Sequence, residues 1–286
     1  MSYLFLSLLT TLWFHCQSLE NVIQLDMVNS SAAYIFSWSS ESDQLAISFI
    51  PKEAREHGFE DVWTNAVKRM NCIVPSGLTK EHMVALYAYT ADYPKHDPFY
   101  RRFNEAVRQY GTNEIIYDKR FVYKSYHYLL ATALEKLTTH SPAEFEWVYR
   151  GIRKLAKGIE GSRMRFGSYT SSSLDEGVAL DFIDNNTKWN TMFFISSRYG
   201  VQIEKYSCFS EEKEVLIPPY EVFQVGRITS RKYGNYVPLT GVDKQGIQVK
   251  LEIGDNGKLV VVPNEGTANS ALGGLWILIA AACIVM

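Results

Sequence analysis

Two kinds of periodic segment follow one another along this chain of 286 residues, and their order limits the folds that it can adopt. In the first half, apolar residues recur at three- and four-residue spacing, which predicts amphipathic helices. The predicted helices cover 59–70, 80–90, 97–111 and 124–139. In the second half, β-branched and aromatic residues lie between Gly, Asn and Asp breaks, which predicts strands. The predicted strands cover 146–152, 164–173, 189–197, 214–225 and 246–254. Helices followed by strands predict an α+β fold rather than alternating βαβ units.

Length and composition favour one globular domain. No linker rich in Pro, Gly or Ser separates the two halves, although the length would also allow two small domains. Hydrophobic residues make up 47% and charged residues 21% of the chain, which is enough apolar surface for a sizeable core. The formal net charge of -2 gives no reason to expect nucleic acid as a partner.

Both ends of the chain predict processing. The apolar run over 4–14 has the length of a signal-peptide core, so residues 1–18 are predicted to be a signal peptide. A buried N-terminal helix is the alternative. The last dozen residues are apolar but shorter than the roughly 20 that span a bilayer. They follow a short polar spacer, so 267–286 fits a glycolipid-anchor signal attached at Gly266, or alternatively at Asn269.

This processing predicts a mature domain over 19–266 on the extracellular face of the plasma membrane, with secretion as the alternative. Cys72 and Cys208 are then the cysteines of the mature chain. An even count outside the cell predicts one disulfide between them, and two buried free thiols are the alternative. Asn29 and Asn185 stand in N-x-[ST] sequons, which predicts glycosylation in a secreted chain.

Several standard catalytic motifs do not occur in the sequence. There is no G-x-G-x-x-G, no phosphate-binding G-x-x-x-x-G-K-[ST] and no zinc-binding H-E-x-x-H. The six His residues are scattered, without metal-ligand spacing, so we expect no metal. The remaining candidates for functional residues are an acidic cluster, a run of Ser residues and a few arginines.

The acidic cluster consists of Glu211, Glu212 and Glu214, directly before the apolar run V-L-I-P-P. Residues two apart on a strand point to the same side, so a strand here would aim Glu212 and Glu214 at one place. Like charges set together cost stability unless they are solvated or used. The cluster is therefore either a solvated strand end or a pair of catalytic carboxylates.

Two further stretches are ambiguous when taken alone. Arg150 lies in the strand-like run V-Y-R-G, where it is either an ion-pair partner or a binder of phosphate oxygens. Ser171 begins a run of three serines, which alone is typical of a turn or a helix cap. No His or Lys accompanies this run, so a nucleophilic Ser is not expected.

Together and in this order, the three stretches resemble the R-S-E constellation of the arginine-specific mono-ADP-ribosyltransferases, in their vertebrate cell-surface branch. Arg150 stands in V-Y-R-G, Ser171 in an aromatic-x-S-S-S strand, and Glu212 and Glu214 in E-x-E before V-L-I-P-P. The resemblance covers 25–251, and E-V-L-I-P-P is its most specific part. The chain departs from the family in two places. The family's cysteine shortly before V-Y-R-G is missing, and its usual Gln is Ser168 here.

The resemblance implies a helical N-terminal half packed on a mixed β-sheet core of the ADP-ribosyltransferase type. It also implies NAD, with NADP as the alternative, as co-substrate without a metal, and transfer of ADP-ribose to protein arginines. Glu214 would stabilise positive charge at the anomeric carbon of the ribose. Glu212 would hold and help deprotonate the incoming guanidinium, which stays protonated at pH 7. Arg150 would bind the phosphates, and Ser171 would orient Glu214 or the ribose.

Further dinucleotide contacts implied by the resemblance are Tyr89, Ser168 and Ser207, although Tyr89 fits a core position on its helix almost equally well. The expected partners are arginine-bearing surface or secreted proteins, and the expected state is a monomer. Two alternatives stay open: an NAD glycohydrolase, and a catalytically silent surface binding module. Glu212 favours transfer over hydrolysis, and the intact Arg150, Ser171 and Glu214 argue against a silent module.

Overall fold

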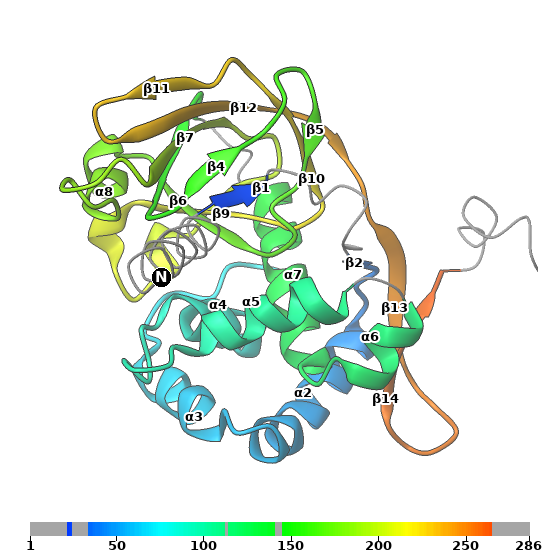
Figure 1. Ribbon diagram of the computed structural model, residues 1–286. Coiled ribbons are helices and arrows are strands. Elements are labelled where there is room, and N and C mark those ends of the chain that lie inside the picture. Colours follow the sequence, from blue (N-terminus) through cyan, green and yellow to red (C-terminus); the bar gives the residue numbers. More distant parts are fainter. Residues whose placement is uncertain (1–21, 25–33, 112–113, 141–144, 265–286) are drawn as a thin grey trace, which may run out of the picture.

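The structure is a computed structural model that describes residues 22–24, 34–111, 114–140 and 145–264. The predicted signal peptide, the predicted anchor signal and Asn29 lie outside these residues. Figure 1 shows the helices of the first half in the lower part of the molecule and a large sheet in the upper part. The α+β prediction is confirmed.

All four predicted helices are present. They are α3 (Glu60–Arg69), α4 (Lys80–Thr90), α5 (Phe99–Tyr110) and α7 (Lys124–His140). The structure adds three helices that the sequence reading missed: α2 (Ser40–Glu56), α6 (Glu114–Arg120) and α8 (Glu176–Asp181). In the described part of the chain, no helix combines the length and apolar character needed to cross a membrane.

The half-buried residue Glu53 fixes the start of α7. Glu53 of α2 accepts hydrogen bonds from the backbone N–H groups of Ser125 and Tyr126, at 2.8 and 3.0 Å. These donors have no partner within their own helix, and the helix dipole favours a negative charge at this end. Burial nevertheless raises the pKa of Glu53 to about 7. The contact therefore joins the first long helix to the last one of the helical half.

The large sheet is mixed, as expected. Among the described residues its strands follow the order β5-β10-β12-β7-β3-β6-β9-β8, with β11 paired to β12. The pair of β7 and β12 is parallel, and the other neighbours are antiparallel. The bounds are β3 (Val148–Ile152), β5 (Arg163–Met164), β6 (Thr170–Ser173), β7 (Asn190–Ser196), β8 (Val201–Gln202), β9 (Glu214–Ile217), β10 (Glu221–Val225), β11 (Thr229–Arg231) and β12 (Gly234–Lys244).

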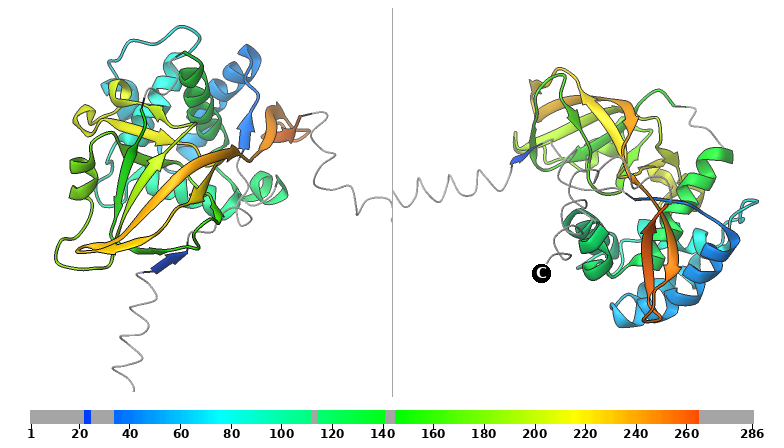
Figure 2. Two further views of the ribbon diagram at one scale, coloured as in Figure 1. Left: turned by 90° about the horizontal axis from the view of Figure 1, so that it is seen from above. Right: turned by 90° about the vertical axis from the view of Figure 1, so that its right-hand side faces the viewer.

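Two small sheets complete the described fold. The strand β1 (Val22–Gln24) pairs in parallel with β4 (Leu155–Lys157). The strand β13 (Ile247–Ile253) lies between β14 (Leu259–Pro263) and β2 (Tyr34–Phe36). Figure 2 shows the chain running from β12 of the large sheet down to β13 beside the helices. This path ties the end of the described chain to the helical half.

Three neighbouring strands near one end of the large sheet bring the predicted catalytic residues together. Tyr149 of β3 pairs with Ser173 of β6, and Ser173 pairs with Glu214 of β9. The three strands that carry R, S and E are therefore adjacent, although they are far apart in the sequence. Two buried apolar clusters hold this arrangement, one between the helices and one on the sheet.

The predicted disulfide is not formed. Cys72 and Cys208 are free, half-buried thiols. The Sγ atom of Cys72 lies 3.3 Å from the Sδ atom of Met70, and Cys208 donates a hydrogen bond to the backbone oxygen of Tyr87 at 3.4 Å. Burial raises the pKa of both thiols. The alternative of two free thiols therefore describes this structure.

Candidate active site

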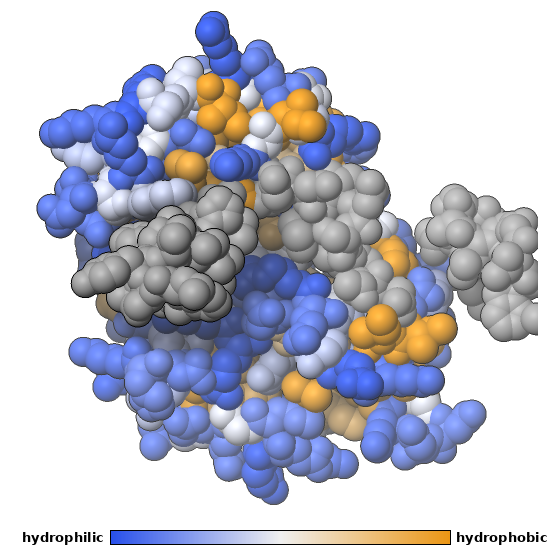
Figure 3. All heavy atoms as spheres, viewed as in Figure 1, coloured by the Kyte–Doolittle hydropathy of each residue, from blue (hydrophilic) through white to orange (hydrophobic). Residues whose placement is uncertain are grey.

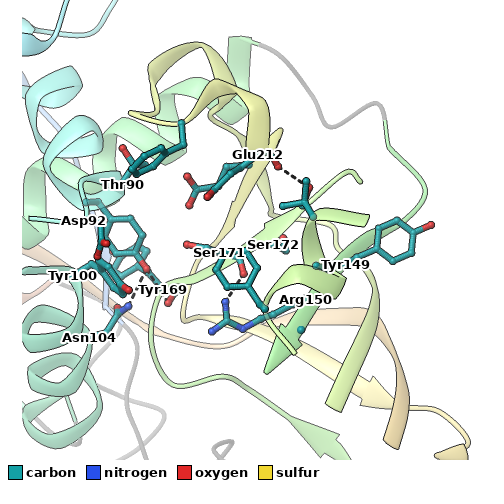
Figure 4. A pocket seen from close by; sticks show the side chains of 18 of the residues that line it. Thr90, Asp92, Tyr100, Asn104, Tyr149, Arg150, Tyr169, Ser171, Ser172 and Glu212 are labelled. Atoms are coloured by element: carbon teal, nitrogen blue, oxygen red, sulfur yellow. Dashed lines mark hydrogen bonds between the residues drawn. The ribbon is translucent and has the colours of Figure 1, made fainter. Parts of the chain in front are cut away.

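A cavity of about 410 Å³ lies between the helical half and the large sheet. Its walls come from α4, α5, β3, β6, α8 and the segment that leads into β9. Figure 4 shows its labelled side chains: Thr90, Asp92, Tyr100 and Asn104 on the helical side face those of the sheet. All four predicted catalytic residues line the cavity: Arg150, Ser171, Glu212 and Glu214. The four residues predicted from the sequence are therefore close together in the folded protein.

Arg150 is held in the cavity by the neighbouring strand. Its Nη1 atom donates a hydrogen bond to the backbone oxygen of Ser171 at 2.5 Å, drawn dashed in Figure 4. Burial, together with the nearby positive charge of Arg108, lowers the pKa of Arg150. Arginine stays charged despite such a shift. A positive charge that is poorly solvated and only partly hydrogen-bonded is a strong binder of phosphate oxygens.

Glu214 is the first residue of β9, and only 5% of its surface is exposed. Burial, followed by the charge of Glu212, raises the pKa of Glu214 to about 7, while hydrogen bonds from Ser171 and Ser207 and the charge of Arg150 act against this rise. Ser207 Oγ lies 3.3 Å from the Oε2 atom of Glu214. The carboxylate is thus poised to change charge near neutral pH, in a place that largely excludes water.

Glu212 reaches the cavity by a different route from the one predicted. It does not lie on a strand with Glu214; it ends a 3₁₀ turn, Ser210–Glu212, and Lys213 follows in the left-handed conformation with φ of 46°. Ser173 Oγ donates to the backbone oxygen of Glu212 at 2.6 Å and anchors this turn. The prediction that Glu212 and Glu214 share one strand is wrong, but a tight turn brings both carboxylates to the same cavity. Burial, and next the charges of Glu211 and Asp92, raise the pKa of Glu212.

The three further predicted contacts lie in different surroundings. Tyr89 lines the cavity, but it is 2% exposed and its hydroxyl is occupied by Tyr169 and Asn104. Ser168 is buried beside a second hollow and accepts a hydrogen bond from Arg108 at 2.6 Å. Ser207 contacts Glu214, as described above. A direct dinucleotide contact of these three residues stays a prediction.

The second hollow is a groove of about 1620 Å³ that shares the wall around Arg150 with the cavity. The floor that is visible between the two halves in Figure 3 is hydrophilic. Cationic side chains outnumber carboxylates along this groove. The cationic lining residues are Arg101, Arg102, Arg108, Arg120, Arg150, Arg153, Lys154 and Arg165, and the acidic ones are Asp97 and Glu105. The groove is therefore suited to an anionic ligand.

Sequence reasoning missed Arg108, which lies close enough to Arg150 to lower its pKa. The available signal was its spacing: Asn104 and Arg108 are four residues apart on α5 and therefore share a face of the helix. It also missed the aromatic side chains of Phe182 and Phe209, which line the cavity. Nothing in their local sequence distinguishes them from ordinary apolar residues.

Metal ligands show no grouping in the part of the chain that the structure describes. No set of three or more His, Cys, Asp or Glu side chains there is arranged to hold a metal ion. A metal-free reaction stays a prediction.

A model of one protein family matches residues 20–246, and its description is NAD:arginine ADP-ribosyltransferase. The chain belongs to this family. GPI-linked NAD(P)(+)--arginine ADP-ribosyltransferase 1 of Mus musculus is 40% identical over 153 residues, which are 53% of this chain and 44% of the relative. Ecto-ADP-ribosyltransferase 5 of Bos taurus is 33% identical over 218 residues, which are 72% of this chain and 66% of the relative. The chain thus spans about half to two thirds of the length of these relatives.

Solved structures of the family share the fold of this family member. The crystal structure of the eucaryotic mono-ADP-ribosyltransferase ART2.2 is 27% identical with a TM-score of 0.63, over 78% of this chain and 96% of that one. A mutant of ART2.2 in complex with NADH is 27% identical with a TM-score of 0.64, over 79% of this chain and 98% of that one. The family resemblance and the predicted ADP-ribosyltransferase fold are confirmed.

Proposed function

We propose that this protein transfers ADP-ribose from NAD to the guanidinium group of protein arginine side chains and releases nicotinamide. The family membership supports this reaction, as do the names of the relatives. The observation that carries it is the meeting of Arg150, Ser171, Glu212 and Glu214 around one cavity. In such a site the cation can bind the phosphates of a dinucleotide, the hydroxyl and one carboxylate can act at its ribose, and the other carboxylate can bind a guanidinium.

The cavity and the groove together provide room and charge for NAD. Arg150 belongs to both walls, and Arg108 lies beside it in the groove. Two guanidinium groups at this junction fit the two phosphates of a dinucleotide through forked, charge-assisted hydrogen bonds. The nicotinamide end then lies in the cavity beside Glu214. NADP is an alternative co-substrate, since the relatives are named for NAD(P).

Glu214 acts on the ribose. Cleavage of the bond between C1′ and the nicotinamide nitrogen develops positive charge on the sugar, as in glycoside hydrolysis. A carboxylate in a site that excludes water stabilises this charge strongly. Ser171 and Ser207 orient the carboxylate and favour its ionised form.

Glu212 acts on the acceptor. A guanidinium is a poor nucleophile until it loses a proton. Glu212 accepts that proton while the arginine nitrogen bonds to C1′ and the nicotinamide leaves as a neutral molecule. The raised pKa of Glu212 suits a general base, because it makes the carboxylate a better proton acceptor.

We place the protein at the cell surface, where it would meet arginine-bearing surface or secreted proteins as a monomer. The names of the GPI-linked and ecto-enzyme relatives support this location. A glycolipid anchor would attach the domain to the outer leaflet. Release of the protein from intact cells by a phosphatidylinositol-specific phospholipase C tests the anchor.

The reaction is tested with purified protein, labelled NAD and agmatine as a minimal acceptor. We expect labelled ADP-ribosylagmatine to exceed free ADP-ribose, with nicotinamide released in an amount equal to the sum of the two. Glu214→Gln should reduce both transfer and hydrolysis by about 10²- to 10³-fold, the loss of one electrostatic stabiliser. Nicotinamide release without any labelled agmatine would identify an NAD glycohydrolase instead, and no cleavage of NAD would identify a silent binding module.

A further inference from the structure

A carboxylate outside the R-S-E constellation reaches the same cavity from the opposite half of the molecule. Asp92 lies two residues after the end of α4 and lines the cavity together with Thr90 and Tyr100. Figure 4 shows Asp92 on the helical wall and Glu212 on the wall that leads into the sheet. Two acidic side chains that are 120 positions apart in the sequence therefore border one opening.

Hydrogen bonds fasten these two walls to each other. The backbone N–H of Cys208 donates to Thr90 Oγ1 at 2.9 Å, and Cys208 Sγ donates to the backbone oxygen of Tyr87 at 3.4 Å. Thr90 precedes Asp92 by two residues, and Cys208 precedes Glu212 by four. The relative position of Asp92 and Glu212 is therefore set by local contacts of the folded chain.

No described residue forms an ion pair or a side-chain hydrogen bond with Asp92 or Glu212. Arg101 lies on the same rim and attracts Asp92 electrostatically, while its Nε atom donates to the hydroxyl of Tyr100 at 3.3 Å. Like charges that border one cavity repel each other, and a bound cation removes that cost.

The ligand that fits this pair is planar and cationic. A guanidinium presents five N–H donors on fixed edges, more than one carboxylate can accept. Glu212 can engage one edge, and a carboxylate on the opposite wall can engage another. Tyr100 and Phe209, which also line the cavity, offer aromatic faces on which a guanidinium stacks well.

We infer that Asp92 is a specificity-determining residue for the acceptor: it binds, together with Glu212, the guanidinium of the arginine to be modified. This inference rests on the proposed function and extends it, because it assigns to the helical half a part in choosing the acceptor. The inference assigns Asp92 no role in the cleavage of NAD, which is proposed to occur beside Glu214 and Arg150.

The test compares Asp92→Asn with the wild-type protein in two assays. With agmatine as acceptor, we expect the KM for agmatine to rise about fivefold, the factor that corresponds to a partly exposed ion pair. Without agmatine, NAD hydrolysis and the KM for NAD should change much less than the KM for agmatine. Asp92→Glu, which restores the charge, should recover most of the affinity. Asp255→Asn is the matched control, since Asp255 is exposed in the turn between β13 and β14.

Salt dependence and direct binding provide two measurements that would not change if Asp92 had only a structural role. In 1 M NaCl, exposed charges are screened within about 3 Å, so the wild-type KM for agmatine should approach that of Asp92→Asn. Saturation-transfer NMR of agmatine with each protein measures the same loss of affinity without turnover. An unchanged KM and affinity in Asp92→Asn would overturn the inference, as would an equal loss of NAD hydrolysis. A wild-type protein that cleaves NAD but never modifies agmatine would instead refute the proposed function itself.

Discussion

Arg150 donates a hydrogen bond from Nη1 to the backbone oxygen of Ser171, and the two atoms are 2.5 Å apart. The contact joins β3 to β6 at a point where the two strands have begun to separate, since their paired residues are Tyr149 and Ser173. It uses one of the five N–H donors of the guanidinium and leaves others directed at the cavity and the groove. The residue proposed to bind phosphate is thereby oriented by the strand that carries Ser171, the serine of the R-S-E constellation.

Replacing Arg150 by Lys tests whether phosphate binding needs the shape of the guanidinium or only its positive charge. A lysine keeps the positive charge but cannot fork onto a phosphate while it also holds Ser171. We expect kcat/KM for NAD to fall about 10- to 100-fold, equivalent to about 1.5 to 3 kcal/mol for a hydrogen bond to a charged group. Steady-state hydrolysis of NAD measures this change, with the melting temperature as a check on folding. A variant that keeps more than half of the wild-type value would show that charge alone suffices.

Replacing Gly151 by Ala should disturb the wall of the cavity through packing. A Cβ atom at this position would lie 2.0 Å from the backbone oxygen of Ala179 and 3.0 Å from Ile183, so α8 would have to move away from β3. Such overpacking typically costs about 1 to 3 kcal/mol. Denaturant unfolding should show that loss, together with weaker NAD cleavage. Gly177→Ala on α8 is the matched control, and an equal loss of stability there would contradict the explanation.

The stability of the protein should depend on the charge of Glu214. Its pKa is about 7 in the folded protein, above its usual 4.5, so the folded state holds the proton more tightly than the unfolded chain. The free energy of unfolding should therefore fall as the pH rises from about 4.5 to 7. Glu214→Gln stays neutral, so it should be more stable than the wild type at pH 8, by up to about 3 kcal/mol.

Denaturant unfolding at pH 4 and at pH 8 measures this difference. At pH 4 the two proteins should have nearly equal stability, because Glu214 is then protonated. Glu53 and Glu221 also have pKa values raised to about 7, but both proteins contain them, so their contributions cancel in the comparison. A stability difference that is the same at both pH values would contradict the assignment.

NAD cleavage should follow the ionisation of the same residue. If the ionised Glu214 stabilises the sugar, kcat/KM for NAD should rise with pH and reach half of its plateau at about pH 7. The charge of Glu212 contributes to this high value, so Glu212→Gln should move the midpoint to lower pH. The pH profile of nicotinamide release in both proteins gives this result. A flat profile between about pH 5.5 and 8.5 would exclude Glu214 as the group that must ionise.

Much of the helical half could be predicted because its signals are local, whereas the R-S-E constellation was predicted from its resemblance to a family. The spacing of apolar residues located α3, α4, α5 and α7 to within two residues at each end. Pro51 inside α2 concealed that helix, because proline removes a helical hydrogen bond and usually ends the pattern. Pro238 and two glycines within β12 concealed that strand in the same way, although it pairs with β7 and β10 on both sides.

The other residues of the site are brought together by tertiary contacts, which leave no pattern in the local sequence. Asp92 and Arg108 join the cavity and the groove only because α4 and α5 pack beside β3 and β6. The left-handed residue Lys213 places Glu212 by a turn, which the alternation expected of a strand did not predict. The count of cysteines favoured a bridge between Cys72 and Cys208, but the fold leaves both as free thiols.

The central claim is that the two carboxylates serve different reactants. Glu212 is proposed to act on the arginine and Glu214 on NAD, although both line one cavity. The most direct measurement follows NAD hydrolysis and transfer to agmatine side by side in Glu212→Gln and Glu214→Gln. Glu212→Gln should lose transfer to agmatine and retain hydrolysis of NAD, while Glu214→Gln should lose both. If Glu212→Gln loses both activities equally, the carboxylates act as one unit and the proposed division of roles is wrong.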